Sequence, residues 1–474
     1  MELTWKQQWF GNIRADVLSG IVIALALIPE SLAFSIIVGV DPMIGLYASM
    51  VMAIVIAFAG GRPGMISAAT GAMALVLAPL VRDYGVEYLF AVTILTGIVQ
   101  ITFSLLGVTK LMRFVPNSVM MGFVNALGIL IFITQVPHFL GEGWATYLYI
   151  GLTLVMVYVI PKFFTLIPAP LIAIISLTVA AMWSGVEMKT IGDAGTLSAT
   201  LPSLLMPNVP WTWETLWILL PYAVALSIVG LLETLLTASV LDDITETKSS
   251  KKREAFGQGV ANIVNGFFGG MAGCALIGQS VMNMQNGGRG RLSTFTAGVT
   301  LVIFVLVLGQ YVMLVPMPIL VGVMLTVAAA TFNWQTFRFV RHAPLSETFV
   351  LLLTMVVTIW TQNLAFGVVS GVLVSALVFV ANISKVRVTK KGDRWFVEGP
   401  LFFASTTPFL QQVEKIEDVD EVVLDFSNSH LWDESAVASL VKAETILERK
   451  DISVKVVGLN EKSRQLYDKL LLND

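Results

Sequence analysis

Long apolar runs separated by short polar segments fill the first four fifths of the 474-residue sequence. A helix needs roughly 20 apolar residues to cross the hydrocarbon core of a bilayer. With this length as the criterion, the pattern predicts membrane spans at residues 15–38, 43–60, 88–107, 114–134, 145–161, 166–184, 216–240, 255–269, 292–313, 316–331, 346–361 and 364–383.

Two further segments, 66–79 and 275–285, are too short to cross a bilayer alone. Both are rich in Gly, Ala, Ser and Thr, which is typical of broken helices that lie at membrane depth within a protein. Counted as half-helices, they bring the prediction to fourteen transmembrane segments. The pattern therefore predicts an α-helical polytopic membrane protein, with a transmembrane domain over residues 1–384.

The pattern changes at about Lys385, where charged residues become frequent. Short alternating strands are followed by a hydrophobic strand, a helix, a further strand and a last helix. Strands that alternate with helices over such a length indicate a small soluble α/β domain, here residues 385–474. The segments are VRVTKKGDRWFVEG, EVVLDFS, ESAVASLVKAETILERK, ISVKVVGLN and EKSRQLYDKLLL.

Composition supports membrane insertion and excludes several other classes of protein. Hydrophobic residues make up 56% of the chain and charged residues 13%, and few water-soluble domains bury that much apolar surface. One cysteine excludes an intramolecular disulfide, and three scattered histidines lack the spacing of a metal site. The net charge of -3, without a basic stripe, argues against a nucleic-acid partner. The predicted partner is the lipid bilayer, and no cofactor or metal is expected.

The loop charges predict the orientation in the membrane. Arg82 and Lys189 stand nearly alone on the side opposite the N-terminus. By the positive-inside rule, both termini and the C-terminal domain are expected in the cytoplasm. The basic residues on the N-terminal side are Arg62, Lys110, Arg113, Lys162, the cluster 248–253, Arg289, Arg291, Arg338 and Arg341.

An internal repeat relates the two halves of the membrane domain. The stretch IPESL around Glu30 is echoed by LLETL around Glu233, an interval of 203 residues. The same interval carries Thr70, in the first half-helix segment, onto Gly273, in the second. Seven elements in each half (about 15–184 and 216–383) give the halves opposite orientations, which is the sequence signature of inverted-repeat transporters.

In such folds the N-termini of two half-helices face each other near the middle of the membrane. Each presents unpaired N–H groups and a partial positive charge, so the two together can bind an anion without lysine or arginine. The predicted anion-binding residues are Ala69, Thr70, Gly71 and Ala72 in the first segment, and Ala275, Leu276, Ile277, Gly278, Gln279 and Ser280 in the second.

Several motifs in this order resemble those of the sulfate permease (SulP) family of anion transporters. They are IPESLAF, GLYASM, SAATGAMALV, LLETLLTASVLDD and GGMAGCALIGQSVMNMQNGGRGRLS, followed by a C-terminal domain that resembles anti-sigma-factor antagonists (STAS). The resemblance implies a core domain that holds both half-helices, a gate domain, elevator movement of the core and a homodimer. It also implies that Glu30, Phe34 and residues 276–279 line the anion pocket. Vertebrate members are basic at the place of Gln279, so this neutral residue leaves more of the anion binding to the helix dipoles.

Two readings of Glu30 remain open. As a proton carrier it would be neutral in one state and charged in another. As a structural residue (a structural patch), it would form hydrogen bonds with backbone groups that Pro29 leaves unpaired. Glu233 is a second, weaker candidate for coupling. The sodium-coupled bicarbonate members of the family are similar around Asp242 and Thr245, which makes these two residues candidate sodium ligands. Those members lack an acid at the place of Glu30, whereas proton-coupled bacterial members have one, and this difference favours protons.

The expected function is secondary active transport of an inorganic anion, such as sulfate or bicarbonate, or of a small carboxylate. Coupling to protons and elevator-type alternating access are expected, in the inner (plasma) membrane of a prokaryote. The alternatives are a sodium-coupled bicarbonate symporter, an uncoupled exchanger or channel on the same fold, and a sensor that binds an anion without flux. An enzyme is not expected, because no pair of nucleophile and base lies at membrane depth.

Overall fold

The computed structural model describes residues 4–110, 115–164, 167–193, 201–417 and 419–471. The chain forms two compact units, Met1–Val372 and Leu373–Asp474, and each is described here by itself. The boundary between them falls within a helix, α16 (Leu364–Ile383).

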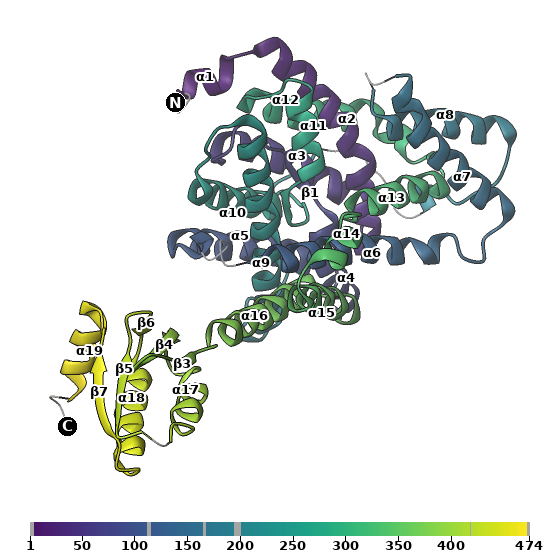
Figure 1. Cartoon of the computed structure of the whole chain (residues 1–474). Helices are drawn as coiled ribbons and strands as arrows, with labels where there is room; N and C mark the ends of the chain where they lie inside the picture. The colour runs from purple at the N-terminus through teal and green to yellow at the C-terminus, as the bar shows by residue number, and fades with distance from the viewer. Residues whose placement is uncertain (1–3, 111–114, 165–166, 194–200, 418, 472–474) are drawn as a thin grey trace. The chain divides into compact units, whose positions relative to one another are not determined.

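Helices make up almost all of the first unit (Figure 1). Short 3-10 turns follow some of them: η2 (Val136–His138), η3 (Ile160–Lys162) and η4 (Ile191–Asp193). The α-helices, besides α16, are α1 (Trp5–Phe10), α2 (Ile13–Val38), α3 (Pro42–Ala59), α4 (Gly71–Tyr84), α5 (Val86–Leu105), α6 (Asn117–Gln135), α7 (Trp144–Val159), α8 (Ala169–Ser184), α9 (Trp213–Thr245), α10 (Lys251–Phe267), α11 (Ile277–Gln285), α12 (Arg291–Val312), α13 (Met317–Thr331), α14 (Thr336–His342) and α15 (Leu345–Thr361).

Each predicted span coincides with a helix, although residues 114 and 166, the first of two spans, lie outside the described residues. In the described part of the chain, eight helices are long and apolar enough to cross a membrane, and three shorter helices are also apolar. The short helix α14 was not predicted. Its sequence, TFRFVRH, has no apolar run of the required length.

The two half-helices begin later than predicted. Residues 67–69 and 273–275 form two three-residue strands, β1 (Ser67–Ala69) and β2 (Gly273–Ala275), and helices α4 and α11 start after them. Ala69 and Ala275 are therefore strand residues, and the assignment of helix to them was wrong. Small residues allow the two extended segments to approach each other closely inside the helical unit, which an apolar-run criterion does not detect.

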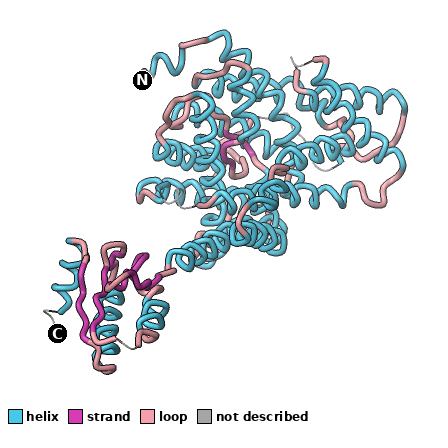
Figure 2. The backbone as a smooth tube through the Cα atoms, in the orientation of Figure 1, coloured by secondary structure: helices cyan, strands magenta, loops and turns pink. Residues whose placement is uncertain are grey.

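Strands β1 and β2 form an antiparallel pair enclosed by helices (Figure 2), with Ala68 opposite Cys274. Because the strands run in opposite directions, α4 and α11 leave this pair at opposite ends. Hydroxyl residues of α2, α3 and α9 hold the strands. Ser31 shares a 2.5 Å hydrogen bond with Ser49, whose Oγ accepts from the Ala69 N–H, and Thr234 Oγ1 accepts from the Ala275 N–H at 3.2 Å.

Contacts within the first unit divide its helices into two groups. In one, α5 packs on α9 and α10, α12 packs on α2 and α3, and the half-helices α4 and α11 lie against α2 and α9. In the other, α6 packs on α13 and α15, and α7 packs on α8 and α13. Fewer contacts join the groups, through α2 with α8 and α13, and through α4 with α6. The acids Glu30 and Glu233 thus belong to the group that also holds both half-helices.

The second unit contains a sheet of order β3-β4-β5-β7, in which β6 also pairs with β4 (Figure 2). Only β3 and β4 are antiparallel. Helix α18 contributes Val437 and Leu440 to a buried core with Phe409 and Phe426. The predicted α/β pattern is confirmed, and β6 and α17 are additions to it. The elements are β3 (Arg387–Lys391), β4 (Arg394–Leu401), α17 (Thr406–Val413), β5 (Glu421–Asp425), β6 (Ser429–Leu431), α18 (Glu434–Glu448), β7 (Ser453–Val457) and α19 (Glu461–Leu471).

Candidate functional site

A cavity of about 660 Å³ lies between the two groups of helices in the first unit. Both half-helix N-termini border it, together with α2, α6, α9, α13 and the segment between α13 and α14. Its lining residues are Glu30, Phe34, Thr70, Gly71, Phe123, Val124, Leu127, Ile131, Glu233, Leu236, Leu276, Ile277, Gly278, Gln279, Val327, Ala330, Thr331, Phe332, Asn333, Trp334 and Gln335.

The half-helix N-termini supply N–H donors to this cavity. Thr70 is the N-cap of α4, and its Oγ1 accepts from the Met73 N–H at 3.4 Å. Leu276 is the N-cap of α11 and provides no side-chain cap, so helix geometry leaves the first N–H groups of α11 without a partner inside the helix. Each N-terminus carries roughly half a positive elementary charge. Two such termini at one cavity favour an anion there.

Glu30 meets the second half-helix directly. The Gln279 Nε2 group donates to both carboxylate oxygens of Glu30, at 2.5 and 2.6 Å. Helix α2 runs on through Pro29, but the described hydrogen bonds of the Glu30 carboxylate go to this amide and to no backbone group. The structural-patch reading of Glu30 thus lacks the contact it requires.

Glu233 reaches the first half-helix through a thiol. Cys274 Sγ donates to Glu233 Oε2 at 3.0 Å and lies 3.2 Å from Thr70 Oγ1, with which it shares a hydrogen bond. Cys274 is fully buried on β2. No local sequence signal places this cysteine between Glu233 and the α4 cap; its position follows from the pairing of β1 with β2.

The structure brings together nine of the predicted site residues along the cavity. The remaining members of the two segments, Ala69, Ala72, Ala275 and Ser280, are buried but do not line it. Ser280 Oγ accepts instead from the Ile66 N–H at 3.0 Å, just before β1. The nine residues on the cavity wall are Glu30, Phe34, Thr70, Gly71, Glu233, Leu276, Ile277, Gly278 and Gln279.

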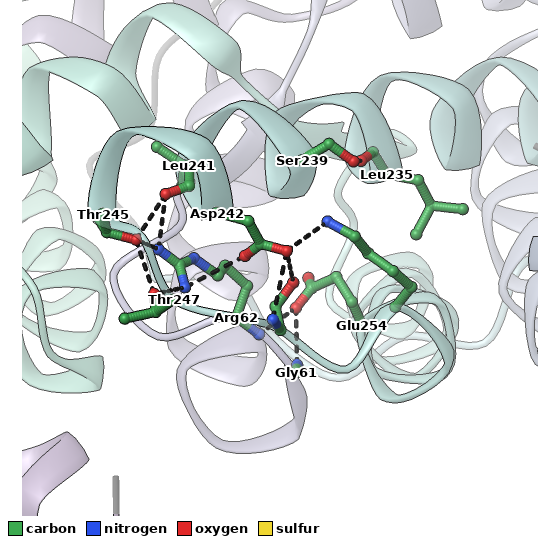
Figure 3. Close-up of polar contacts among 11 residues, drawn as sticks. Gly61, Arg62, Leu235, Ser239, Leu241, Asp242, Thr245, Thr247 and Glu254 are labelled. Carbon is green, nitrogen blue, oxygen red and sulfur yellow. Dashed lines mark hydrogen bonds and ion pairs between the residues drawn. The ribbon is translucent and has the colours of Figure 1, made fainter. Parts of the chain in front are cut away.

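Asp242 and Thr245 lie apart from the cavity, in a charged cluster at the end of α9 (Figure 3). The Arg62 guanidinium lies 3.3 Å from Asp242 and donates to Thr245 Oγ1 at 2.5 Å. Lys251 also contacts Asp242, at 2.9 Å. Burial lowers the pKa of Arg62 from its usual value, and the charge of Asp242 opposes that effect. The Asp242 carboxylate is thus already paired with two side-chain cations, Arg62 and Lys251. Among the described residues, no group of three acidic, His or Cys side chains is arranged to hold a metal ion.

The wall opposite the half-helices was not predicted from the sequence. It is formed by apolar side chains of α6 and by residues 332–335. Asn125, buried on α6, fixes this segment, because its Nδ2 donates to Thr336 Oγ1 at 2.7 Å and its Oδ1 accepts from the Asn333 N–H at 2.8 Å. The available signal was an asparagine within an apolar span, which indicates a polar partner on another helix.

The charge balance of the cavity is unusual for an anion site. Its described lining residues include two carboxylic acids, Glu30 and Glu233, and no lysine, arginine or histidine. The other polar side-chain groups are the amides of Gln279, Asn333 and Gln335, the hydroxyls of Thr70 and Thr331 and the indole N–H of Trp334. Positive potential in the cavity therefore comes from the two helix N-termini, and the acids oppose it whenever they are ionised.

A polytopic helical protein with a central cavity at two half-helix N-termini belongs to the class of membrane transporters. Residues 13–146 and 142–354 match the model of the Sulfate permease family, and residues 395–474 match the STAS domain. The chain belongs to the sulfate permease family. The expectations of a family of anion transporters and of a C-terminal STAS domain are thereby confirmed.

The relatives of this chain include transporters that are named for two different anions. The chain is 50% identical to "Putative sulfate transporter YbaR" of Bacillus subtilis (strain 168), covering 98% of this chain and 99% of that protein. It is 25% identical to "Bicarbonate transporter BicA" of Picosynechococcus sp. (strain ATCC 27264 / PCC 7002 / PR-6), covering 100% of this chain and 93% of that protein.

Two solved structures share the fold. The transmembrane domain of a cyanobacterial bicarbonate transporter BicA aligns with a TM-score of 0.68 at 26% identity, over 75% of this chain and 97% of that one. The murine Solute Carrier 26 family member A9 anion transporter, in the inward-facing state, aligns with a TM-score of 0.84 at 16% identity, over 99% of this chain and 88% of that one.

Proposed function

We propose that this protein is a secondary active transporter that carries a small oxyanion together with protons. Sulfate is the first candidate, because it stands in the name of the relative with 50% identity, and bicarbonate is the second. Both ions carry several acceptor oxygens around one centre, and helix N–H groups bind such oxygens well.

The observation that carries this proposal is a cavity whose described lining has two acids and no basic side chain. Two helix N-termini contribute roughly +1 charge in total. With both Glu30 and Glu233 ionised the balance is negative, and an anion about 6 Å from one carboxylate meets a repulsion of about 3 kcal/mol at an effective dielectric constant of about 20. Protonation removes this repulsion, so a proton and an anion favour each other's binding.

The sodium-coupled alternative has less support in the contacts. Asp242 would have to release Arg62 or Lys251 before it bound sodium. The uncoupled exchanger or channel and the sensor leave the two acids on the cavity wall without a role. Proton symport gives them one.

For the architecture, we propose the same number of spans, repeats, orientation and oligomeric state that the sequence predicts. We propose fourteen membrane segments as two inverted repeats of seven, and a homodimer in the plasma membrane of a prokaryote. Both termini and the STAS domain are cytoplasmic, and the membrane domain ends near residue 384. The helix group with α4 and α11 acts as the core that moves, and the group around α6 and α13 acts as the gate. The observed division of helix contacts supports this assignment.

The test is uptake of radiolabelled sulfate, and separately of bicarbonate, into proteoliposomes under an imposed proton gradient with the membrane potential clamped. The full-length protein is expected to accumulate the anion above equilibrium when the medium is acidic outside. Glu30→Gln is expected to lose this accumulation, because its side chain no longer takes up a proton, while passive equilibration of the anion continues.

Glu214→Gln is the matched control. This acid lies in the first turn of α9, is exposed and does not line the cavity, so the variant should behave as the parent. Accumulation driven by a sodium gradient alone would support the sodium symporter instead. Equilibration without accumulation under every gradient would support the channel and refute the proposal.

A further inference from the structure

Gln279 links the Glu30 carboxylate to the N-terminal turn of α11. It occupies the first turn of α11, where the free N–H groups of that half-helix face the cavity, and the residue is only 8% exposed. Its Nε2 is nearly equidistant from the two Glu30 oxygens, so the NH₂ group meets the carboxylate end-on. In this arrangement the amide donors are directed at Glu30 and withheld from the cavity.

The amide is the only hydrogen-bond partner of the Glu30 side chain in the described part of the chain. An ionised carboxylate only accepts hydrogen bonds, whereas a protonated one carries an O–H donor. A glutamine amide carries a C=O acceptor and an NH₂ donor. Rotation by about 180° about the terminal side-chain torsion, which has a broad two-fold potential, exchanges their positions. The amide should therefore direct its NH₂ group at an ionised Glu30 and its C=O group at a protonated one.

We infer that Gln279 is the coupling residue: when Glu30 takes up a proton, the amide turns so that its Oε1 accepts the new O–H and its NH₂ group faces the anion. The proton stays on Glu30, and no covalent bond other than its O–H forms or breaks. When an anion leaves and Glu30 loses the proton, the NH₂ group returns to the carboxylate. This inference rests on the proposed proton coupling and assigns its mechanism to one side chain.

Other charged groups near Glu30 do not provide this link. Helices α8, α11 and α13, which pack near or against α2, contain no charged residue, and α3 contains only Tyr47 as a titratable one. Arg82, Asp83 and Tyr84 are at the far end of α4, and Arg291 and Tyr311 are near the ends of α12. Arg14 and Asp16 begin α2, about 20 Å from Glu30 at 1.5 Å per residue. Glu233, which also lines the cavity, accepts a hydrogen bond from Cys274.

A purely electrostatic link and an amide switch differ in one measurable respect. If Glu30 acts only through its charge, removal of the Gln279 amide weakens anion binding equally at all pH values. With the switch, the amide donates to the anion only when Glu30 is protonated, so its removal weakens binding in acidic buffer and much less in alkaline buffer.

The first experiment measures binding of radiolabelled sulfate to full-length protein in nanodiscs, in acidic and alkaline buffer, for the parent and Gln279→Met. Methionine keeps the length of the side chain without a donor. We expect about a tenfold loss of affinity in acid, equivalent to one hydrogen bond to a charged group, and little loss in alkali. The matched control is Gln285→Met, an exposed glutamine at the end of the same helix. Equal losses in both buffers overturn the inference.

The second experiment needs no anion and separates this inference from the proposed function. Infrared difference spectra between acidic and alkaline buffer should contain a carboxylic-acid C=O band that disappears in Glu30→Gln. The band should shift in Gln279→Met, because the O–H then loses its amide acceptor. An unshifted band refutes the switch even where proton-driven uptake is present, and a shifted band with no proton-driven uptake refutes the proposed function alone.

Discussion

Replacement of Arg62 by methionine tests whether the cluster at the end of α9 is structural. The Arg62 side chain is 6% exposed and lies 3.3 Å from Asp242. It also donates to Thr247 Oγ1 at 2.7 Å, to the Leu241 carbonyl at 3.0 Å and to Thr245 Oγ1 at 2.5 Å. These contacts join the loop before β1 to the C-terminal end of α9 (Figure 3).

The expected cost follows from these contacts. Removal of one partner of a buried ion pair costs about 3–5 kcal/mol, because the other charge is left uncompensated. Lys251 remains 2.9 Å from Asp242, and methionine still buries an apolar stem, so the lower end of about 3 kcal/mol applies. At roughly 2 cal/mol/K of unfolding entropy per residue, the unit Met1–Val372 should melt about 4 °C lower.

The assay is thermal unfolding of the purified protein in detergent, followed by tryptophan fluorescence. Arg82→Met is the control, because Arg82 is 76% exposed and among the described residues pairs only with its neighbour Asp83, so its loss should cost less than about 1 kcal/mol. Asp242→Asn should also lower the melting temperature and leave uptake per folded molecule unchanged. An Arg62→Met protein as stable as the parent, or an Asp242→Asn protein that keeps its stability and loses sodium-stimulated uptake, would refute this reasoning.

Two further substitutions test the cavity wall and the STAS domain. A Cβ at Gly278 would meet no atom within 4 Å, whereas one at Gly71 would lie 3.0 Å from Phe34. Gly278→Ala should therefore raise the KM for the anion several-fold without lowering the melting temperature; an unchanged KM would place the anion elsewhere. In the STAS domain, hydrogen bonds from Ser427, with Arg394 nearby, lower the pKa of Asp425 below its usual value. This contribution to stability is present above the unfolded-state pKa of about 3.9 and is lost as the pH falls through the lower folded-state value. Asp425→Asn should thus lower the stability of β5 by about 1–2 kcal/mol at neutral pH, which speeds its hydrogen exchange, and should make that stability depend less on acid pH. An unchanged exchange rate at neutral pH would contradict this.

The sequence predicted the helices well because a membrane span needs a long apolar run and must satisfy its backbone hydrogen bonds as a helix. The repeat also predicted which two acids lie near the half-helices, since Glu30 and Glu233 hold equivalent places. The strands β1 and β2 were missed because three small residues carry no periodicity of their own. They become strands through pairing with a segment about 200 residues away.

The contacts that define the site were beyond sequence reasoning for a related reason. Gln279 and Glu30 are 249 residues apart, and nothing local indicates that one bonds to the other. Asp242 and Thr245 have the side chains of a cation site, but Arg62, 180 residues earlier in the chain, supplies the cation. The wall formed by residues 332–335 lacks any charged residue, so composition offers no reason to place it at the cavity.

The residue after each acid explains why acids and half-helices should move together. Ser31 bonds through Ser49 to the Ala69 N–H, and Thr234 bonds to the Ala275 N–H, so each acid is adjacent to a hydroxyl that holds a strand leading toward a half-helix. The opposite wall belongs to the other group of helices. If the two groups slide past each other, the carboxyl groups, the helix N-termini and a bound anion keep their mutual distances while the apolar wall changes. The field at the anion would then stay constant during the movement, and under the proposed proton coupling, proton uptake and release at Glu30 and Glu233 would control anion binding only at its two ends.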